Sequence, residues 1–223
     1  MSRIVVIDTE TTGMDHEKDR LVELAACWMV PDLGLAQFSA ICDPGIPIPP
    51  EAMAVHHITD SMVSGFQTQE HNAGLLQAGA GPDTIWAAHN AAFDRGFLPQ
   101  LPGQWICTWR CSMHLWPEAP GHGNQVLRYW LKLPVDLPEG LYPHRALYDA
   151  VVTHALLMRM LETHSVEDLL RLSLEPVILH TVRFGKHRGM LWSEVPRDYL
   201  QWVRRQTDMD PDVMHTVKHI LRA

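Results

Sequence analysis

The sequence predicts an α/β fold for most of its 223 residues. The β-branched, apolar run Arg3–Thr9 predicts a buried strand near the N-terminus. Two further strands are expected over 21–30 and 35–42, because the turn-forming segment Pro31–Gly34 separates two apolar runs. Apolar side chains at helical spacing predict a long helix over 146–161. The expected start of the fold is therefore an antiparallel three-stranded meander, followed by helices.

Shorter elements are expected between the meander and the long helix. Thr59 divides the segment 50–63 into two short helical pieces, and the apolar run 84–88 predicts another strand. Helices are expected over 93–100 and 124–131. The three tryptophans within 105–116 are more typical of core packing than of a base-stacking platform.

The C-terminal part reads as a separate small module. Residues 176–223 predict a strand, a Phe-Gly turn and two short helices over 197–206 and 211–221. A module of this size is marginally stable alone, so we expect it to pack on the main domain. The predicted organisation is one α/β domain over 1–170 and a small α+β module over 176–223.

Composition excludes several classes of protein. Hydrophobic residues at 46% and charged residues at 20% exclude a disordered chain. No apolar run approaches the roughly 20 residues of a membrane helix, and the N-terminus enters a strand without a secretory signal pattern. The four cysteines lack CxxC spacing, so we expect reduced thiols in a cytoplasmic protein rather than a zinc site.

The charge is unevenly distributed along the chain. The net charge is −8, with −11 over residues 1–175 and +3 over residues 176–223. An acidic body predicts modest, salt-sensitive affinity for a phosphate backbone, and the basic excess lies in the C-terminal module.

Two carboxylates stand at the end of the first predicted strand. Asp8 and Glu10 are two positions apart, so their side chains project from the same face of the strand. Adjacent carboxylates repel each other unless a cation lies between them. Oxygen ligands suit a hard cation such as magnesium or manganese. Solvated turn residues are the alternative interpretation of these two positions.

Three separated motifs carry a resemblance to a known family. They are Asp8-Thr9-Glu10-Thr11-Thr12-Gly13, His89-Asn90-Ala91-Ala92-Phe93-Asp94 and His144-Arg145-Ala146-Leu147-Tyr148-Asp149. The chain resembles the DEDDh 3′→5′ exonucleases of the proofreading-exonuclease superfamily. This resemblance implies an RNase H-like fold, with a mixed five-stranded sheet flanked by helices. Segments 50–59, 102–108 and 184–189 are similar to a free-standing DNA-degrading branch of that superfamily.

The resemblance implies a mechanism and a set of catalytic residues. Asp8, Glu10, Asp94 and Asp149 would bind two Mg²⁺ or Mn²⁺ ions, and His144 would act as general base. The reaction would release nucleoside 5′-monophosphates from DNA 3′ ends, single-stranded or duplex, in repair or recombination. Since a general base must be neutral, we expect activity to rise with pH through the histidine range.

Further residues are expected to contact the substrate. The backbone after Glu10 can approach the terminal nucleotide closely because glycine adds no bulk. His57 departs from the His-Gly-Ile pattern of the family at that position. The basic pair in the C-terminal module is expected to grip DNA, with a charged surface hairpin as the alternative. The full set is Thr11, Thr12, Gly13, Met14, His56, His57, His89, Asn90, Phe93, Lys186 and Arg188.

Other functions fit the same motifs. An RNase T-like or oligoribonuclease-like RNA exonuclease, or a polymerase proofreading subunit, would have the same metal site. A catalytically silent nucleic-acid-binding module would normally lack one of the ligands, and all are present here. The sequence leaves strandedness, processivity, oligomeric state and the cellular metal open, and it predicts no membrane partner.

Overall fold

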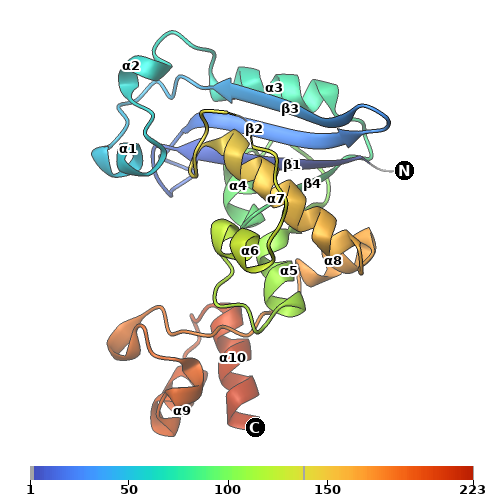
Figure 1. The fold of residues 1–223 in the computed structure, drawn as a ribbon. Helices are drawn as coiled ribbons and strands as arrows, with labels where there is room; N and C mark the ends of the chain where they lie inside the picture. Colours follow the sequence, from blue (N-terminus) through green and yellow to red (C-terminus); the bar gives the residue numbers. More distant parts are fainter. Residues whose placement is uncertain (1–2, 138, 223) are drawn as a thin grey trace. The chain divides into compact units, whose positions relative to one another are not determined.

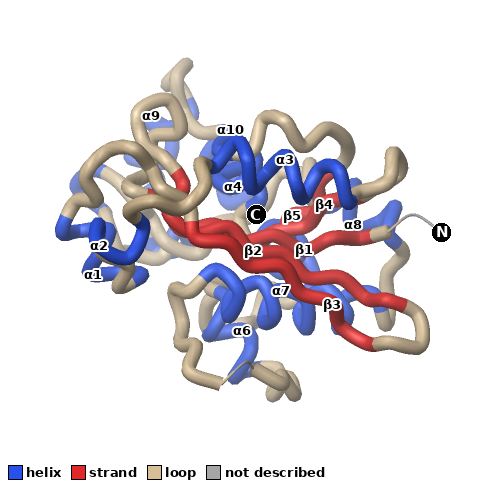
Figure 2. Tube along the Cα trace, turned by 90° about the horizontal axis from the view of Figure 1, so that it is seen from above, coloured by secondary structure: helices blue, strands red, loops and turns tan. Residues whose placement is uncertain are grey.

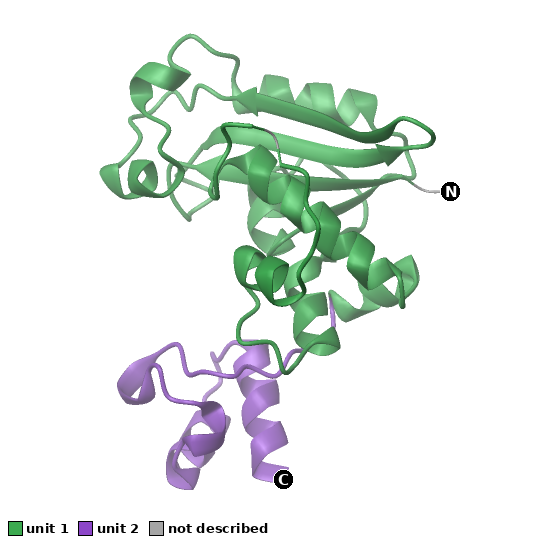
Figure 3. Cartoon of the chain, viewed as in Figure 1, with its two compact units in different colours: residues 1–173 green, residues 174–223 purple. Residues whose placement is uncertain are grey.

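The computed structural model describes residues 3–137 and 139–222. The chain folds into two compact units, residues 1–173 and residues 174–223 (Figure 3). The sequence-based division was 1–170 and 176–223.

A five-stranded mixed sheet forms the centre of the first unit, as the family resemblance implied (Figure 1). Its order is β3-β2-β1-β4-β5, and β1 pairs antiparallel with β2 and parallel with β4. The β2–β3 pair is antiparallel and the β4–β5 pair is parallel. The strands are β1 Ile4–Thr11, β2 Leu21–Val30, β3 Gly34–Ile41, β4 Ile85–Ala88 and β5 Trp105–Cys107.

Strand alternation gives the sheet two apolar faces. Val5 and Ile7 of β1 belong to a core cluster with residues of α3 (Gln69–Gly79) and α4 (Ala91–Phe97). Val6, between them, belongs to the opposite cluster, which is built on α7 (Ala146–Leu161). Figure 2 shows α3 and α7 on opposite sides of the strands. Because alternate side chains of a strand point to opposite faces, Asp8 and Glu10 share the α7 side with Val6.

The remaining helices of the first unit are short. Thr59 separates two of them, as predicted. Helix α3 was not predicted from the sequence, because its segment contains two glycines and few apolar residues. Strand β5 was not predicted either, since it spans only three residues within the tryptophan-rich segment. The short helices are α1 Pro50–His56, α2 Asp60–Val63, α5 Thr108–Leu115, α6 Asn124–Trp130 and α8 Val166–Leu172.

The second unit contains helices α9 (Arg197–Arg204) and α10 (Pro211–Arg222). The strand expected before the Phe-Gly turn is reduced to a single antiparallel bridge between Thr181 and Leu191. Residues 180 and 182 do share backbone hydrogen bonds with the chain after the turn, since the Trp192 amide donates to the His180 carbonyl (2.9 Å) and the Val182 amide to the Met190 carbonyl (2.9 Å). The residues before them bind side chains of α10 instead, which keeps the ladder short. The Val177 amide donates to Asp212 Oδ1 (3.1 Å), and the Leu179 amide donates to Thr216 Oγ1 (2.9 Å).

The structure bears on two expectations from composition, those about the cysteines and about membrane-spanning segments. All four cysteines are free and buried, and burial raises the pKa of the Cys27 thiol to about 12 and that of Cys111 to about 11. Among the described residues, no helix has the length and apolar character needed to span a membrane.

Candidate active site

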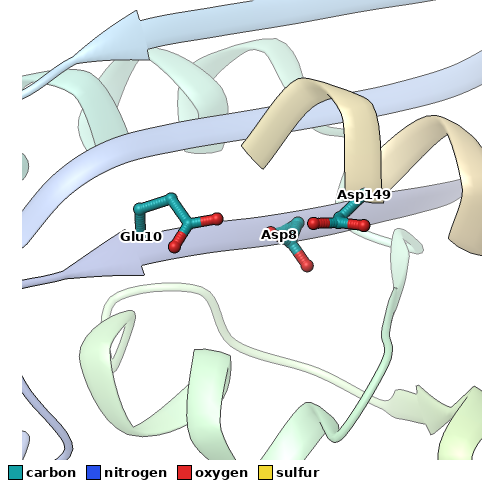
Figure 4. A group of neighbouring side chains, drawn as sticks. All are labelled: Asp8, Glu10 and Asp149. Atoms are coloured by element: carbon teal, nitrogen blue, oxygen red, sulfur yellow. The ribbon is translucent and has the colours of Figure 1, made fainter. Parts of the chain in front are cut away.

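Three carboxylates meet where the end of β1 faces the start of α7 (Figure 4). Asp8 and Glu10 come from alternate positions of β1, and Asp149 lies in the first turn of α7. One oxygen from each of the three lies within 4.8 Å of the others. The structure therefore brings together residues that lie far apart in the sequence, as the family resemblance implied.

The cluster carries more negative charge than its surroundings neutralise. Burial, together with Asp94 and Asp149, holds the pKa of Asp8 well above its usual range. Burial and the nearby carboxylates of Asp149 and Glu23 raise the pKa of Glu10 to about 9. Burial also raises the pKa of Asp149. In the absence of a cation, burial and mutual repulsion therefore favour the protonated forms of these carboxyl groups.

Asp94 lies beside the cluster and outside the set of three. It is in the first turn of α4, which follows β4. Because β4 is parallel to β1, this places Asp94 at the same C-terminal end of the two strands as Glu10. Thr9 Oγ1 donates to Asp94 Oδ1 (2.8 Å). Burial raises the pKa of Asp94 to about 7, and the hydrogen bond from Thr9 opposes that rise.

Asp149 is held by donors from two directions. The backbone amide of His144 donates to its Oδ2 (2.7 Å), and Gln125 Nε2 donates to its Oδ1 (3.1 Å). His144 itself has a positive φ of 66°, and it is exposed. Its backbone thus contacts the acidic cluster, while its imidazole is accessible at the edge of the site.

A buried ion pair fixes the segment that contains His144. Arg145 Nε and Nη2 donate to the two oxygens of Glu23 at 2.9 and 2.7 Å, and the Ala146 amide donates to Glu23 Oε2 (2.9 Å). Glu23 is 2% exposed. It lies on β2 directly opposite Glu10 of β1. The start of α7 is therefore attached to the strand that pairs with β1 and its acidic residues.

The turn after β1 uses its threonine hydroxyls internally. Thr11 Oγ1 donates to the Gly13 carbonyl (2.6 Å), and Thr12 Oγ1 donates to Asp19 Oδ1 (3.1 Å). A Cβ at Gly13 would overlap the Asp19 carboxylate, which gives a packing reason for the glycine beyond the expected approach of substrate. Met14, by contrast, is 79% exposed next to this turn.

The histidines expected to contact substrate differ in accessibility. His56 is buried, and its Nδ1 accepts the Ile58 amide (3.0 Å). His57 is exposed, caps α1 with a φ of 58° and packs against Tyr142 at 5.5 Å between ring centroids. This left-handed backbone explains why glycine suits the position in the family pattern. His89 uses both ring nitrogens inside the protein, on Thr108 Oγ1 (2.9 Å) and the His122 carbonyl (2.8 Å).

The other expected contacts lie in different surroundings. Asn90 is exposed, with a φ of 73° at the start of α4. Phe93 is partly buried against the core and lies 5.1 Å from the ring of Phe97. Lys186 and Arg188 are exposed in the second unit.

Sequence reasoning missed the residues that support the ligands. Glu23 lies within an apolar strand pattern, and Arg145 occupies a position between the motif residues to which the motif assigns no role. Gln125 lies on a short helix with no motif, and Asp19 lies in a loop. One feature of the sequence does point to Glu23: it is a charged residue inside the apolar run Leu21–Ala26. A charged residue that a strand pattern buries needs a partner, which predicts an ion pair or hydrogen bonds at this position.

The arrangement suits divalent cations. Carboxylate oxygens are hard ligands, and a cation among them would remove the repulsion that now raises the pKa values of Asp8 and Glu10. The cluster of three, with Asp94 beside it, offers four carboxylates at the C-terminal end of β1. A cluster of oxygens with no sulfur or imidazole in the set of three fits magnesium or manganese better than zinc.

Comparisons with known proteins agree with this geometry. Residues 5–157 match the model of the exonuclease family (RNase_T). Exodeoxyribonuclease 10 of Escherichia coli (strain K12) is 37% identical over 222 residues, which cover 97% of each chain. The DNA polymerase III PolC-type of Halalkalibacterium halodurans is 31% identical over 178 residues, which are 76% of this chain and 12% of that protein.

The fold is also similar to a solved structure. A structure of exonuclease X in complex with 5′ overhanging duplex DNA matches with a TM-score of 0.69 and 36% identity. The match covers 76% of this chain and 99% of the other.

The raised carboxyl pKa values generate a prediction about stability. In the unfolded chain these groups regain their ordinary pKa values near 4, so folding takes up protons between about pH 4 and pH 9. The metal-free protein should therefore lose stability as pH rises through this window. In EDTA the Tm at pH 8.5 should be lower than at pH 5.5. Added Mg²⁺ should raise it at pH 8.5 by at least about 2–4 °C, the effect of roughly 1 kcal/mol in a chain of this size.

Two variants control this measurement. Asp8→Asn removes one of the repelling charges, so it should flatten the pH dependence in EDTA. Asp32→Asn changes an exposed carboxylate outside the cluster and should leave the slope as in the wild type. A metal-free protein that is more stable at pH 8.5 than at pH 5.5 would contradict the prediction.

The buried ion pair generates a second prediction. Arg145→Met leaves Glu23 buried without its partner, so the free energy of unfolding should fall by about 3–5 kcal/mol in urea titrations. The double variant Glu23→Met/Arg145→Met removes both charges and should recover much of that loss. Arg159→Met breaks an exposed pair with Glu162 and should change stability by less than about 1 kcal/mol. Equal effects of Arg145→Met and Arg159→Met would show that the buried pair has no special role.

Proposed function

The chain belongs to the exonuclease family (RNase_T), and we propose that it removes nucleoside 5′-monophosphates from the 3′ ends of DNA. The reaction would be hydrolysis of the terminal phosphodiester, assisted by two divalent metal ions. The observation that carries this proposal is the group of Asp8, Glu10 and Asp149 at the end of β1, in which one oxygen of each lies within 4.8 Å of the others.

The metal ions would be held by four carboxylates. Asp8, Glu10 and Asp149 form the close set, and Asp94 lies beside it. Two bound cations, Mg²⁺ or Mn²⁺, would stabilise negative charge on the attacking and leaving oxygens of an in-line displacement. The neighbouring residues would keep these ligands in place: Thr9 orients Asp94, and Gln125 together with the His144 amide orients Asp149.

Proton transfer is the contribution proposed for His144. Its imidazole would accept a proton from the attacking water as the new bond from oxygen to phosphorus forms. The bond from phosphorus to the 3′-oxygen of the preceding nucleotide then breaks, and that oxygen leaves with a proton taken from solvent. The bidentate pair of Arg145 and Glu23 fixes the chain next to His144. The exposed turn at Met14 is proposed to lie against the terminal base.

The choice of DNA rests on the relatives. Exodeoxyribonuclease 10 matches over 97% of both chains, which includes the second unit, and its name states a DNA substrate. The PolC-type relative corresponds to a small part of a much longer protein. A free-standing DNA exonuclease is therefore favoured over an RNA exonuclease or a proofreading subunit. Action in the cytoplasm, in DNA repair or recombination, remains the expectation from the reduced thiols and the family resemblance.

A labelled-strand assay tests the proposal. With Mg²⁺, a 3′-labelled DNA strand should release its labelled nucleotide at once, whereas a 5′-labelled strand should give a ladder of shortening products. EDTA should abolish the release of the 3′ label and the ladder alike. Asp8→Asn should lower the rate by at least about 10³-fold, because Asp8 is the ligand proposed to bind both metal ions. A matched RNA strand distinguishes the two substrates. Early release of a 5′ label, or cleavage in EDTA, would overturn the proposal.

The role of His144 generates a separate prediction. His144→Ala should lower the rate by about 10²–10⁴-fold, the usual contribution of a general base. Because none of the four carboxylates is changed, the Mg²⁺-dependent rise in Tm should be kept. His71→Ala, an exposed histidine on α3, serves as the control and should keep the wild-type rate. A near-normal rate for His144→Ala would exclude it as the base.

A further inference from the structure

The second unit carries a stacked aromatic pair, a buried tyrosine under an exposed tryptophan, whose chemistry suits a nucleobase. We propose that Tyr199 and Trp202 of α9 form a stacking platform for single-stranded DNA, with Lys186 at one end of it to bind phosphate. This inference rests on the proposed DNA substrate and extends it to a second binding surface, one that recognises the bases upstream of the 3′ end.

The platform is a row of side chains in contact. The rings of Tyr199 and Trp202 are stacked, with 5.3 Å between centroids and 27° between planes. Lys186 Nζ lies 5.2 Å from the centroid of the Tyr199 ring, and the imidazole of His187 meets the same ring edge-on at 4.5 Å. Tyr199 is 9% exposed beneath these neighbours, whereas Trp202 is 49% exposed. The row therefore ends in an accessible indole.

The core of this unit does not require an aromatic residue at position 202. Helix α9 buries Tyr199, Leu200 and Val203, and Trp202 lies at the flank of that face. The other tryptophan of the unit, Trp192, is 1% exposed and packs with Phe184 at 6.1 Å, so it supplies the aromatic core. An indole that stacks on a tyrosine and leaves half of its surface in solvent has the form of a base-stacking site.

The loop that carries the lysine is built onto the tyrosine. Gly185 has a φ of 63°, and a Cβ at this position would lie 2.8 Å from the Tyr199 hydroxyl. The glycine therefore allows the loop to approach the ring closely, and this approach places the ammonium group of Lys186 over the ring. The motif that the sequence singled out as a DNA-gripping loop is thus part of the same structure as the aromatic pair.

Charge favours a polyanion as the partner. Residues 174–223 contain 8 Lys and Arg against 6 Asp and Glu, whereas residues 1–173 contain 10 against 20. Three of the acidic groups in the second unit bind backbone amides: Asp198 that of Tyr199, Asp210 that of Val213 and Asp212 that of Val177. Lys186, Arg188, Arg204 and Arg205 are exposed. One carboxylate, that of Asp198, lies one helical turn before Trp202 and would limit affinity at that end.

A platform on the same chain as the exonuclease unit would retain the substrate between cleavage events. A second weak site on one polypeptide raises the local concentration of substrate without changing the chemistry of the first site. Each base that stacks on an aromatic side chain strengthens binding independently of sequence, as a degrading enzyme needs.

The test separates base stacking from phosphate binding. Two single strands of about 20 nucleotides would share the same four nucleotides at the 3′ end. One carries bases upstream, and the other is abasic upstream, so both have the same charge and the same 3′ terminus. Binding is measured by fluorescence anisotropy with the full chain carrying Asp8→Asn, which keeps the DNA uncut.

Trp202→Ala should weaken binding of the base-bearing strand by about 5- to 100-fold and leave the abasic strand within about 2-fold. Trp202→Phe keeps an aromatic face and should retain most of the affinity. Lys186→Gln with Arg188→Gln should weaken both strands equally, since phosphates are common to both. Leu174→Ala, which truncates a more exposed apolar residue of the same unit (83%), should change neither.

Two results would overturn the platform. One is binding of the base-bearing strand by Trp202→Ala within about 2-fold of the parent, and the other is an equal loss for both strands. If Trp202→Ala lowers the Tm, Trp202→Leu replaces it, because leucine keeps an apolar side chain without a π face. Hydrolysis of a three-nucleotide strand, with Asp8 intact, separates the platform from the proposed function. If Trp202→Ala cleaves this strand at the wild-type rate, the proposed function is supported whatever happens to the platform. If the wild type itself does not cleave it, the proposed function is refuted.

Discussion

Repulsion among carboxylates at the junction of β1 and α7 is the constraint on which this structure depends. Asp8 and Glu10 cannot avoid each other, because strand geometry points both side chains to one face. The first turn of α7 adds Asp149 to that face. These three carboxyl groups can lie close together only if they are protonated or if cations lie between their oxygens. Burial strengthens this need, because it disfavours the charged carboxylates further. The repulsion within the acidic cluster therefore favours the binding of a divalent cation.

The surrounding protein holds this charge without neutralising it. Thr9, Gln125 and backbone amides donate hydrogen bonds to Asp94 and Asp149, which orients their oxygens. The nearby guanidinium of Arg145 is committed to Glu23 by two hydrogen bonds. This arrangement attaches α7 to the sheet while leaving the cluster negative. A metal site needs this separation, because an arginine bound directly to the ligands would compete with the cations.

The two units differ in charge and in chemistry. The first unit is acidic, and its site consists of carboxylates that suit cations. The second unit is basic, and its exposed surface combines an aromatic stack with an ammonium group. A nucleic acid presents phosphates and bases. In the proposed function, metal ions held by the carboxylates would contact the scissile phosphate, and the aromatic rings would contact bases. The net charge of the whole chain, at −8, conceals this division.

Strand alternation and helical periodicity in the sequence were enough to predict the meander and the long helix 146–161, because these are local properties that survive without tertiary contacts. The set of four carboxylates came instead from the three motifs that resemble the exonuclease family. Helix α3 and strand β5 were decided by packing, since neither has a pattern strong enough to specify it alone. The same holds for the Glu23–Arg145 pair and the internal use of His89. Each of these joins residues that no local rule relates, and their partners exist only once the chain has folded.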